Sequence, residues 1–420
     1  MTNSEELQTA ALGLRVAGSA GRRRAWSAAE PDSIEALQVV YKIAERCNIN
    51  CSYCYYFNMG EKTPMGRPAH ASLKVTDALA RWIAQGCREL RIPRVRLSFH
   101  GGEPMLIGAD LFDKTCRRLR EVIEPVATLD LSIQTNGMFV DERWIDRFIE
   151  HHVGIGVSID GGKADNDRFR LDRRGRSTFQ KTEQAIRRLV EAHDRGASLP
   201  STISVLHHEN DYRAIYRYLR GLGVLELSFL LPDRDANDAA FISSGLGAAY
   251  GACLADIFRE WLAEDNSHVS IKFIDETLAH FRRGVAPGSM FRRPRKSNQI
   301  VIARSDGTIA VDDTYIPALA WYQRTPVYSV TEHTLREFLA DPIFSDIEQI
   351  SASLPTGCRD CRWREVCRGG DIENRFSLSD GFDHPSVYCE AYKVMYQAVC
   401  DELTANGYPL ELIADKFVAA

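Results

Sequence analysis

The sequence predicts an α/β fold, a partial (β/α)6 TIM-type barrel followed by a smaller, loop-rich C-terminal unit. Three observations predict this arrangement. Short β-branched runs alternate with helix-patterned segments as far as residue 231. A polar stretch with Gly and Pro then leads into a region of different character. Cysteines gather in two clusters, one directly after the first predicted strand and one in the C-terminal region.

The predicted strands are apolar runs of four to eight residues bounded by Gly, Pro, Asp or Asn, as strands are. Helical segments separate them, and alternation of this kind is typical of a parallel sheet built from βα units. Six units are too few for a complete eight-stranded barrel, which favours a partial one. The predicted strands are 37–43, 95–100, 129–135, 153–159, 201–206 and 225–231.

Between the strands, apolar residues recur at helical spacing. Ser72 and Asp141 stand where an N-cap residue is expected, just before two of these segments. In barrels of this type the chemistry lies at the carboxyl ends of the strands, so the residues that follow each strand are the first candidates for a site. The predicted helices are 72–90, 111–123, 141–152, 178–193 and 211–222.

Beyond residue 231 the alternation stops. Helical patterns occupy 247–264 and 273–284, and 300–315 reads as a hairpin around an Asp-Gly turn. A further helical pattern covers 388–403. The predicted organisation is an N-terminal tail at 1–35, a barrel at 36–235, a helical bridge at 236–298 and a cysteine-bearing unit at 299–420.

Composition excludes several classes of protein. The 420 residues are 45% hydrophobic and 26% charged, which suits a folded enzyme-sized chain. The net charge of -5 disfavours a nucleic-acid partner. No apolar run reaches the ~18 residues of a membrane span, and the acidic N-terminus is a poor signal peptide. We therefore expect a cytoplasmic protein without a membrane partner, in which cysteines serve as metal ligands, reactive thiols or core residues.

The N-terminal cysteine cluster consists of Cys47, Cys51 and Cys54. A structural zinc site uses four ligands, and the nearest further candidate is His70. A [4Fe–4S] cluster is usually held by four cysteines, so three thiolates leave one iron open to a substrate or cofactor. The alternatives for these thiols are zinc binding or a place in the core.

This C-x3-C-x2-C spacing after a first barrel strand resembles the radical S-adenosylmethionine (radical SAM) family. Four further segments fall in that family's order: GGEP at 101–104, SIQTNG at 132–137, VSIDG at 157–161 and NDRFR at 166–170. The resemblance implies a [4Fe–4S] cluster on the N-terminal cysteine cluster, with S-adenosylmethionine on its open iron. The residues it places at the cofactor are Tyr53, Gly101, Gly102, Glu103, Gln134, Asn136, Ser158, Asp160 and Arg170.

The chemistry of these side chains suits such a cofactor. Glu103 can accept hydrogen bonds from an ammonium group and Asp160 from a ribose hydroxyl, while Arg170 can hold a carboxylate in a bidentate pair. Tyr53 can offer a ring face to adenine, and the two glycines allow backbone to approach a ligand closely. The alternative is that individual residues of the set only cap a strand or a helix.

The C-terminal cysteine cluster consists of Cys358, Cys361, Cys367 and Cys389. Its spacing alone leaves zinc and iron–sulfur open. The region resembles the SPASM extension of radical SAM peptide maturases, whose full pattern supports two auxiliary clusters. Asp312 and Asp371 stand where that pattern has cysteines of the inner cluster. The resemblance therefore implies one auxiliary [4Fe–4S] cluster, on the C-terminal cysteine cluster.

Taken over residues 37–405, the chain most resembles maturases that install three-residue cyclophanes in ribosomally made precursor peptides. The resemblance implies a carbon–carbon crosslink to an aromatic residue, with electrons from an external donor of flavodoxin or ferredoxin type. Asp313 is the predicted base, since related sulfatase-maturing enzymes carry an aspartate there; the alternative is a solvated hairpin aspartate. Alternative reactions are formylglycine formation on a sulfatase, thioether formation and epimerisation.

A different class of protein, a zinc-stabilised binding module without catalysis, is the remaining alternative. The intact N-terminal cysteine cluster and GGEP segment argue against it. The four cysteines outside the two clusters occupy positions typical of small core residues. These are Cys87, Cys116, Cys253 and Cys400.

Overall fold

The computed structural model describes residues 34–282, 300–414 and 416–417. Within these residues ten strands form one sheet, in the order β10-β9-β8-β1-β2-β3-β4-β5-β6-β7. All neighbours from β8 to β7 are parallel, and β8–β9 and β9–β10 are antiparallel. The strands are β1 Leu37–Ala44, β2 Arg94–Gly101, β3 Thr128–Thr135, β4 Gly154–Ser158, β5 Ser201–Val205, β6 Glu226–Leu230, β7 Ser270–Ile271, β8 Ile300–Arg304, β9 Thr308–Ala310 and β10 Tyr328–Ser329.

The partial barrel of six βα units is confirmed, and the described sheet is wider than the six predicted strands. On one side β7 adds two residues beside β6, a strand too short to leave a pattern in the sequence. On the other side β8 pairs in parallel with β1. The predicted hairpin is present as β8 and β9, but it continues the barrel sheet and does not stand apart from it.

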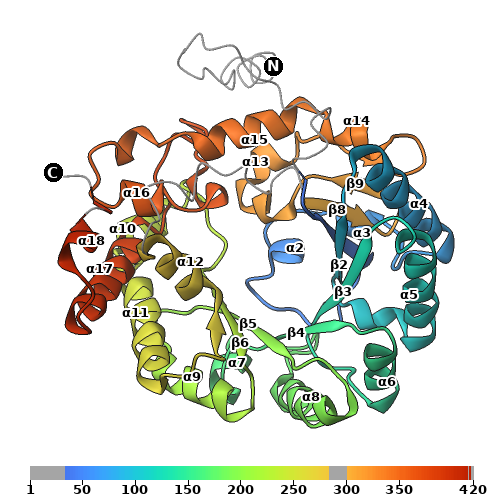
Figure 1. The fold of residues 1–420 in the computed structure, drawn as a ribbon, viewed down its shortest axis with the longest axis horizontal. Coiled ribbons are helices and arrows are strands. Elements are labelled where there is room, and N and C mark those ends of the chain that lie inside the picture. The colour runs from blue at the N-terminus through green and yellow to red at the C-terminus, as the bar shows by residue number, and fades with distance from the viewer. Residues whose placement is uncertain (1–33, 283–299, 415, 418–420) are drawn as a thin grey trace.

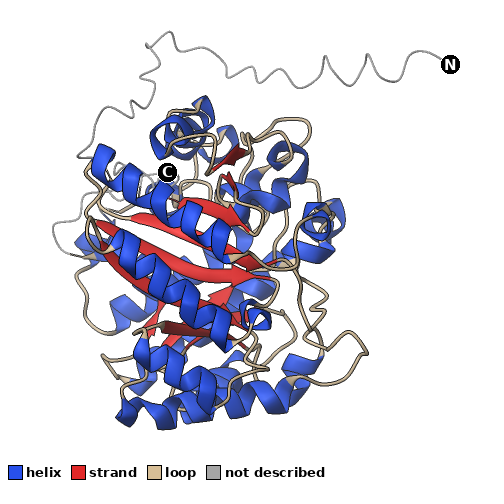
Figure 2. Ribbon diagram, turned by 90° about the vertical axis from the view of Figure 1, so that its right-hand side faces the viewer, coloured by secondary structure: helices blue, strands red, loops and turns tan. Residues whose placement is uncertain are grey.

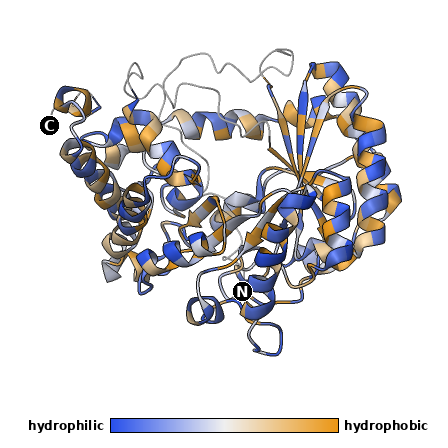
Figure 3. Ribbon diagram, turned by 60° about the horizontal axis from the view of Figure 1, so that its bottom comes forward, coloured by the Kyte–Doolittle hydropathy of each residue, from blue (hydrophilic) through white to orange (hydrophobic). Residues whose placement is uncertain are grey.

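Helices surround the strands (Figures 1 and 2). Ser72 accepts a hydrogen bond from the Val75 amide and Asp141 from the Trp144 amide, so both predicted N-caps are confirmed. Along the outer helices the hydropathy colours alternate, as in amphipathic helices (Figure 3). The helices of the barrel are α2 Tyr55–Asn58, α3 Thr63–Gly66, α4 Leu73–Leu90, α5 Ala109–Ile123, α6 Glu142–Glu150, α7 Lys163–Asp167, α8 Phe179–Glu191 and α9 Tyr212–Gly221.

The C-terminal half adds helices beside the open part of the ring (Figure 1). They are mostly short and joined by loops, as predicted for this region, while α11 and α17 are long and lie close to the predicted bounds. They are α10 Ala239–Ser244, α11 Gly247–Glu264, α12 Lys272–Phe281, α13 Leu319–Tyr322, α14 Leu335–Leu339, α15 Pro342–Ala352, α16 Arg364–Cys367, α17 Cys389–Ala405 and α18 Leu410–Ala414.

The predicted domain boundaries stay predictions. Most of the tail at 1–35 and the connector at 283–299 lie outside the described residues. Among the described helices, none combines the length and the apolar character needed to span a bilayer.

The two faces of the sheet differ in chemistry. Val95, Leu97 and Phe99 of β2 are buried with the core, and the residues between them point to the opposite face because side chains alternate along a strand. On β1 and β2 that opposite face carries Lys42 and His100, which are paired in register. Helix α2 lies on this inner side, within the ring (Figure 1).

Candidate active site

The N-terminal cysteine cluster lies on the loop between β1 and α2, and the end of β2 holds that loop in place. The amide of Gly102 donates to the Ala44 carbonyl at 2.7 Å, and the amide of Glu103 donates to the Arg46 carbonyl at 2.8 Å. A Cβ at Gly101 would lie 1.9 Å from the Ala44 carbonyl oxygen, and one at Gly102 would lie 2.1 Å from that of Arg46. The glycines therefore let β2 pack directly against the backbone that carries the cysteines.

Glu103 is buried beside this loop and connects β2 to β3. Its carboxylate accepts hydrogen bonds from the amides of Met105 at 3.0 Å and Asn136 at 2.8 Å, and from the hydroxyl of Thr135 at 2.8 Å. Burial raises the pKa of Glu103 to about 6, although these hydrogen bonds oppose the shift. A carboxylate has about four acceptor positions, so one is left for a further donor.

Asn136 approaches the cysteine loop from the end of β3. Its side-chain amide donates to Asn48 at 2.8 Å and lies 3.9 Å from the Cys47 sulfur. Nearby, the Gln134 amide donates to the Ser158 hydroxyl at 2.9 Å, so these two predicted residues meet at the ends of β3 and β4. The structure thus brings the predicted residues of β3 and β4 to the same end of the sheet as the cysteine loop.

Tyr53, Asp160 and Arg170 form a single buried network. The Tyr53 hydroxyl donates to Asp160 at 2.7 Å and accepts from Arg170 at 2.8 Å. The other oxygen of Asp160 accepts from the Val205 amide at 3.1 Å. Burial raises the pKa of Asp160 against the opposing charge of Arg170. Both carboxylate oxygens of Asp160 are thus already hydrogen-bonded within the protein, and Tyr53 is held by its hydroxyl.

A second polar group occupies the inner face of the barrel. Lys42 has a fully buried side chain, and its ammonium lies 2.5 Å from Asp313. It also donates to the Tyr55 hydroxyl at 3.0 Å and lies 3.2 Å from the His100 ring. Burial and the Lys42 charge lower the pKa of His100 to about 3, so this imidazole is neutral. Sequence reasoning found Asp313 but missed its partners; a lysine inside the apolar run of β1 was the available signal.

Further buried carboxylates lie near this ion pair. Burial alone would raise the pKa of Asp313, but the Lys42 ammonium outweighs burial and the pKa is lowered. Asp312 and Asp233 have pKa values raised to about 6, by burial first and by repulsion from Asp313 second. Glu373 has a raised pKa for the same first reason. Four residues separate Gly307 from Asp312, which stands where the SPASM pattern has a cysteine.

The four cysteines of the C-terminal cluster line one small cavity. Thiolates on a single tetrahedral zinc would lie ~3.8 Å apart, given Zn–S bonds of ~2.3 Å. Among the described residues, the one set of three metal-ligating groups within 4.8 Å of one another contains no cysteine. Both cysteine clusters are therefore spread more widely than ligands of one ion, and the thiols of the C-terminal cluster surround a space. This arrangement fits an iron–sulfur cluster better than zinc.

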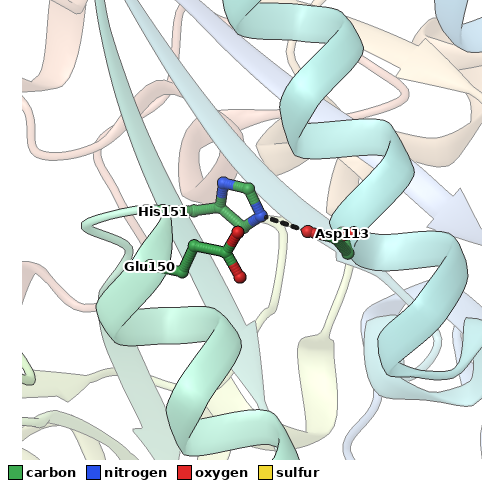
Figure 4. Close-up of side chains that lie close together, drawn as sticks. All are labelled: Asp113, Glu150 and His151. Atoms are coloured by element: carbon green, nitrogen blue, oxygen red, sulfur yellow. Dashed lines mark hydrogen bonds and ion pairs between the residues drawn. The ribbon is translucent and has the colours of Figure 1, made fainter.

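That one compact set, Asp113, Glu150 and His151, joins α5 and α6 (Figure 4). The His151 ring lies 2.8 Å from an Asp113 carboxylate oxygen. Arg117 and Arg147 form ion pairs with these carboxylates. A metal ion there would compete with two guanidinium groups, so the set is an ion-pair group between helices. The four remaining cysteines are buried as predicted: Cys87, Cys116, Cys253 and Cys400.

The family comparison decides the class of the barrel. Residues 41–219, from β1 to α9, match the model of the Radical SAM superfamily. These residues are a radical SAM domain. The match confirms the prediction of a radical SAM enzyme, whose domain binds a [4Fe–4S] cluster and S-adenosylmethionine. The individual contacts predicted for that cofactor remain predictions, and the auxiliary cluster rests on the cysteine cavity described above.

The similarity to relatives extends beyond the radical SAM domain. Over 383 residues the chain is 25% identical to the serine-type anaerobic sulfatase-maturating enzyme of Bacteroides thetaiotaomicron, covering 86% of this chain and 88% of that protein. Native anSMEcpe with bound AdoMet and Cp18Cys peptide matches with a TM-score of 0.72 at 20% identity, over 88% of this chain and 98% of that one. Streptococcus suis SuiB bound to precursor peptide SuiA matches with a TM-score of 0.57 at 14% identity, over 85% and 76%. The structural matches establish a shared fold that extends past the barrel.

Proposed function

We propose that this chain is a radical SAM peptide maturase that joins an aromatic side-chain carbon to the Cβ of a residue two positions further along a ribosomally made precursor peptide. A peptide or protein substrate is supported by the relatives, which are named as sulfatase-maturating enzymes, and by the matched structures, two of which are named as peptide complexes. The crosslink itself is supported by the residues quoted above and by the acidic groups inside the barrel.

The observation that carries this choice of reaction is the pair Asp312–Asp313. In the SPASM pattern a cysteine of the inner cluster stands at the first of these positions, and another stands at the position of Asp371. Here the first position holds a carboxylate among other carboxylates, so the inner cluster of the full pattern has lost ligands. That loss sets the chain apart from sulfatase-maturing enzymes with the complete set.

The residues that would hold the cofactors follow from the geometry. The N-terminal cysteine cluster would hold the [4Fe–4S] cluster, and the open acceptor position of Glu103 is available to the cofactor's ammonium group. When bound, these groups supply the 5′-deoxyadenosyl radical that removes one hydrogen atom from the substrate Cβ. The Tyr53–Asp160–Arg170 network would form the neighbouring wall of the cofactor site. Hydrogen bonds among its three side chains hold each of them in place.

Restoring the aromatic ring after the new bond forms requires loss of one proton and one electron. Asp313 was the predicted base, but its lowered pKa and its bond to Lys42 make it a weak proton acceptor. The neighbouring Asp312, with a pKa of about 6, is better matched to neutral pH. We assign the proton to this aspartate pair, with Asp313 holding Lys42 and Asp312 as the stronger base. An auxiliary [4Fe–4S] cluster on the C-terminal cysteine cluster would be the electron acceptor.

Formylglycine formation is the second candidate, favoured by the identity to sulfatase-maturating enzymes over most of the chain. Both reactions lower the mass of the substrate by two hydrogen atoms, because oxidation of a serine and formation of a crosslink each remove two. Mass alone therefore does not separate them, but chemistry does. Formylglycine is an aldehyde, whereas a crosslinked peptide has no aldehyde and resists backbone fragmentation between the joined residues.

The test uses anaerobically reconstituted enzyme, S-adenosylmethionine, a reductant and a candidate precursor peptide, to be sought as a short open reading frame beside the gene. The expected product has lost two hydrogen atoms, does not react with a hydrazide probe, and lacks fragment ions between an aromatic residue and the second residue after it. The control is the variant with the N-terminal cysteine cluster changed to alanine, which should leave the peptide unchanged. A hydrazide-reactive product would replace the proposal with formylglycine formation.

A further inference from the structure

Helix α17 contributes more than one group to the C-terminal cysteine cluster. The helix begins at Cys389, one of the four cysteines, and the next two turns place Tyr392, Lys393 and Tyr396 in the wall of the same cavity. The N-terminal end of a helix carries partial positive charge, which favours an anion placed there. This helix therefore presents a ligand, its positive end and three polar side chains to one space.

Two of those side chains lie beside the thiols. Lys393 lines the cavity together with Cys389 and Cys361, close enough for its charge to act on both thiols. Tyr396 is 8% exposed and lines the same cavity as Cys367. Glu390 pairs with the Lys393 ammonium at 2.8 Å, so an acidic group offsets part of that positive charge. One helix thus presents Lys393 and Tyr396 to the cavity that the four sulfurs line.

We propose that Lys393 and Tyr396 set the reduction potential of the auxiliary cluster, raising it above the value that four thiolates alone would give. A thiolate-held [4Fe–4S] cluster gains one negative charge when it accepts one electron. A nearby cation and hydrogen bonds to the sulfurs stabilise that extra charge, and both are known determinants of cluster potentials. Lys393 acts through its charge and Tyr396 through its hydroxyl. This inference rests on the auxiliary cluster proposed above and does not depend on which peptide product forms.

The charge arrangement predicts opposite shifts of the reduction potential for substitutions at Lys393 and Glu390. Lys393→Met removes the positive charge and should make the cluster harder to reduce. Glu390→Gln removes the negative charge that offsets Lys393 and should make the cluster easier to reduce. A lysine that only supported the fold would give no reason for opposite shifts. Lys393→Arg keeps the charge and is the matched control, and Tyr396→Phe removes only the hydroxyl.

The experiment is an anaerobic redox titration followed by electron paramagnetic resonance. It is done in the variant whose N-terminal cysteine cluster is changed to alanine, so that one cluster gives the signal. Iron and acid-labile sulfide are counted first in every sample. Lys393→Met is expected to lower the equilibrium constant for reduction by tenfold or more, which is about 59 mV for one electron. Tyr396→Phe is expected to shift it in the same direction by less, and Glu390→Gln in the opposite direction.

The possible results separate two failures. Zinc in place of iron in the starting protein would overturn the auxiliary cluster, and this inference would fall with it. A full complement of iron with equal potentials in Lys393→Met, Lys393→Arg and the starting protein would overturn the role of Lys393 alone. If Lys393→Met assembles no cluster, Glu390→Gln and Tyr396→Phe still decide the question, because neither removes the lysine.

Discussion

Replacement of Lys42 by methionine should destabilise the barrel strongly. The ammonium is fully buried and lies against Asp313, Tyr55 and His100. Methionine keeps most of the volume but leaves the carboxylate of Asp313 buried without its cation. Removal of one partner from a buried ion pair costs ~3–5 kcal/mol of the free energy of unfolding. With a urea slope of about 3 kcal/mol/M, the unfolding midpoint should fall by roughly 1–1.7 M.

The pH dependence of that loss has a definite sign. In the native protein the pKa of Asp313 is lowered, so its ionised form stabilises the fold above the ordinary aspartate value and this contribution disappears as pH falls through the lowered pKa. Without Lys42, burial raises the pKa of Asp313 instead, and the carboxylate takes up a proton on acidification. The difference in stability between wild type and Lys42→Met should therefore be smaller at pH 5 than at pH 7.

The assay is urea unfolding followed by circular dichroism, with all four members of a double-mutant cycle under the same cofactor conditions. Asp313→Leu is the second single variant and Lys42→Met/Asp313→Leu is the double. We expect the double variant to recover most of the loss, because no unpaired charge remains. Single variants within about 1 kcal/mol of wild type, or a double variant equal to the sum of the singles, would refute the assignment of a coupled buried pair.

Three other predictions concern the sites. Alanine at all three positions of the N-terminal cysteine cluster should reduce reconstituted iron from roughly eight to roughly four atoms per chain, as counted by iron and sulfide analysis. A count of roughly twelve iron atoms in the wild type would contradict a single auxiliary cluster. Gly102→Ala should lose the same four irons because its Cβ meets the Arg46 carbonyl, whereas Gly221→Ala, with open space at its Cβ, should retain them. If Asp312 is the base, product formation should decline as pH falls below about 6. Asp312→Asn should form 5′-deoxyadenosine but little product, and its remaining product should no longer decline with pH. An unchanged pH profile in this variant would exclude Asp312 as the base.

Local structure was largely predictable from the sequence. The six predicted strands and the N-caps at Ser72 and Asp141 rest on patterns within a few residues, and the structure reproduces them. The cysteine loop was predictable for the same reason. Glycine at 101 and 102 was also recognised, but for close approach to a ligand; the structure shows that each Cβ would meet the backbone of the cysteine loop.

Long-range pairing was not predictable. Nothing in the run 37–43 indicates that its lysine will meet Asp313, because that contact depends on β8 pairing with β1. The hairpin containing β8 looked like part of a separate unit, since its own sequence shows only strand alternation and a turn. The raised pKa of Asp233 has the same origin, because it comes from burial and from the charge of Asp313, which is distant in the sequence.

The packing of β2 against the cysteine loop limits how related chains can diverge. The atoms that would collide with a Cβ at positions 101 and 102 are carbonyl oxygens of the main chain. A crowded side chain can be trimmed by a second mutation elsewhere, but a main-chain oxygen is present whatever residue carries it. No compensating substitution is therefore available without rebuilding the loop. Among homologues that keep the three cysteines, loss of either glycine should mark copies that no longer assemble the site, which gives a simple way to separate active enzymes from degenerate ones.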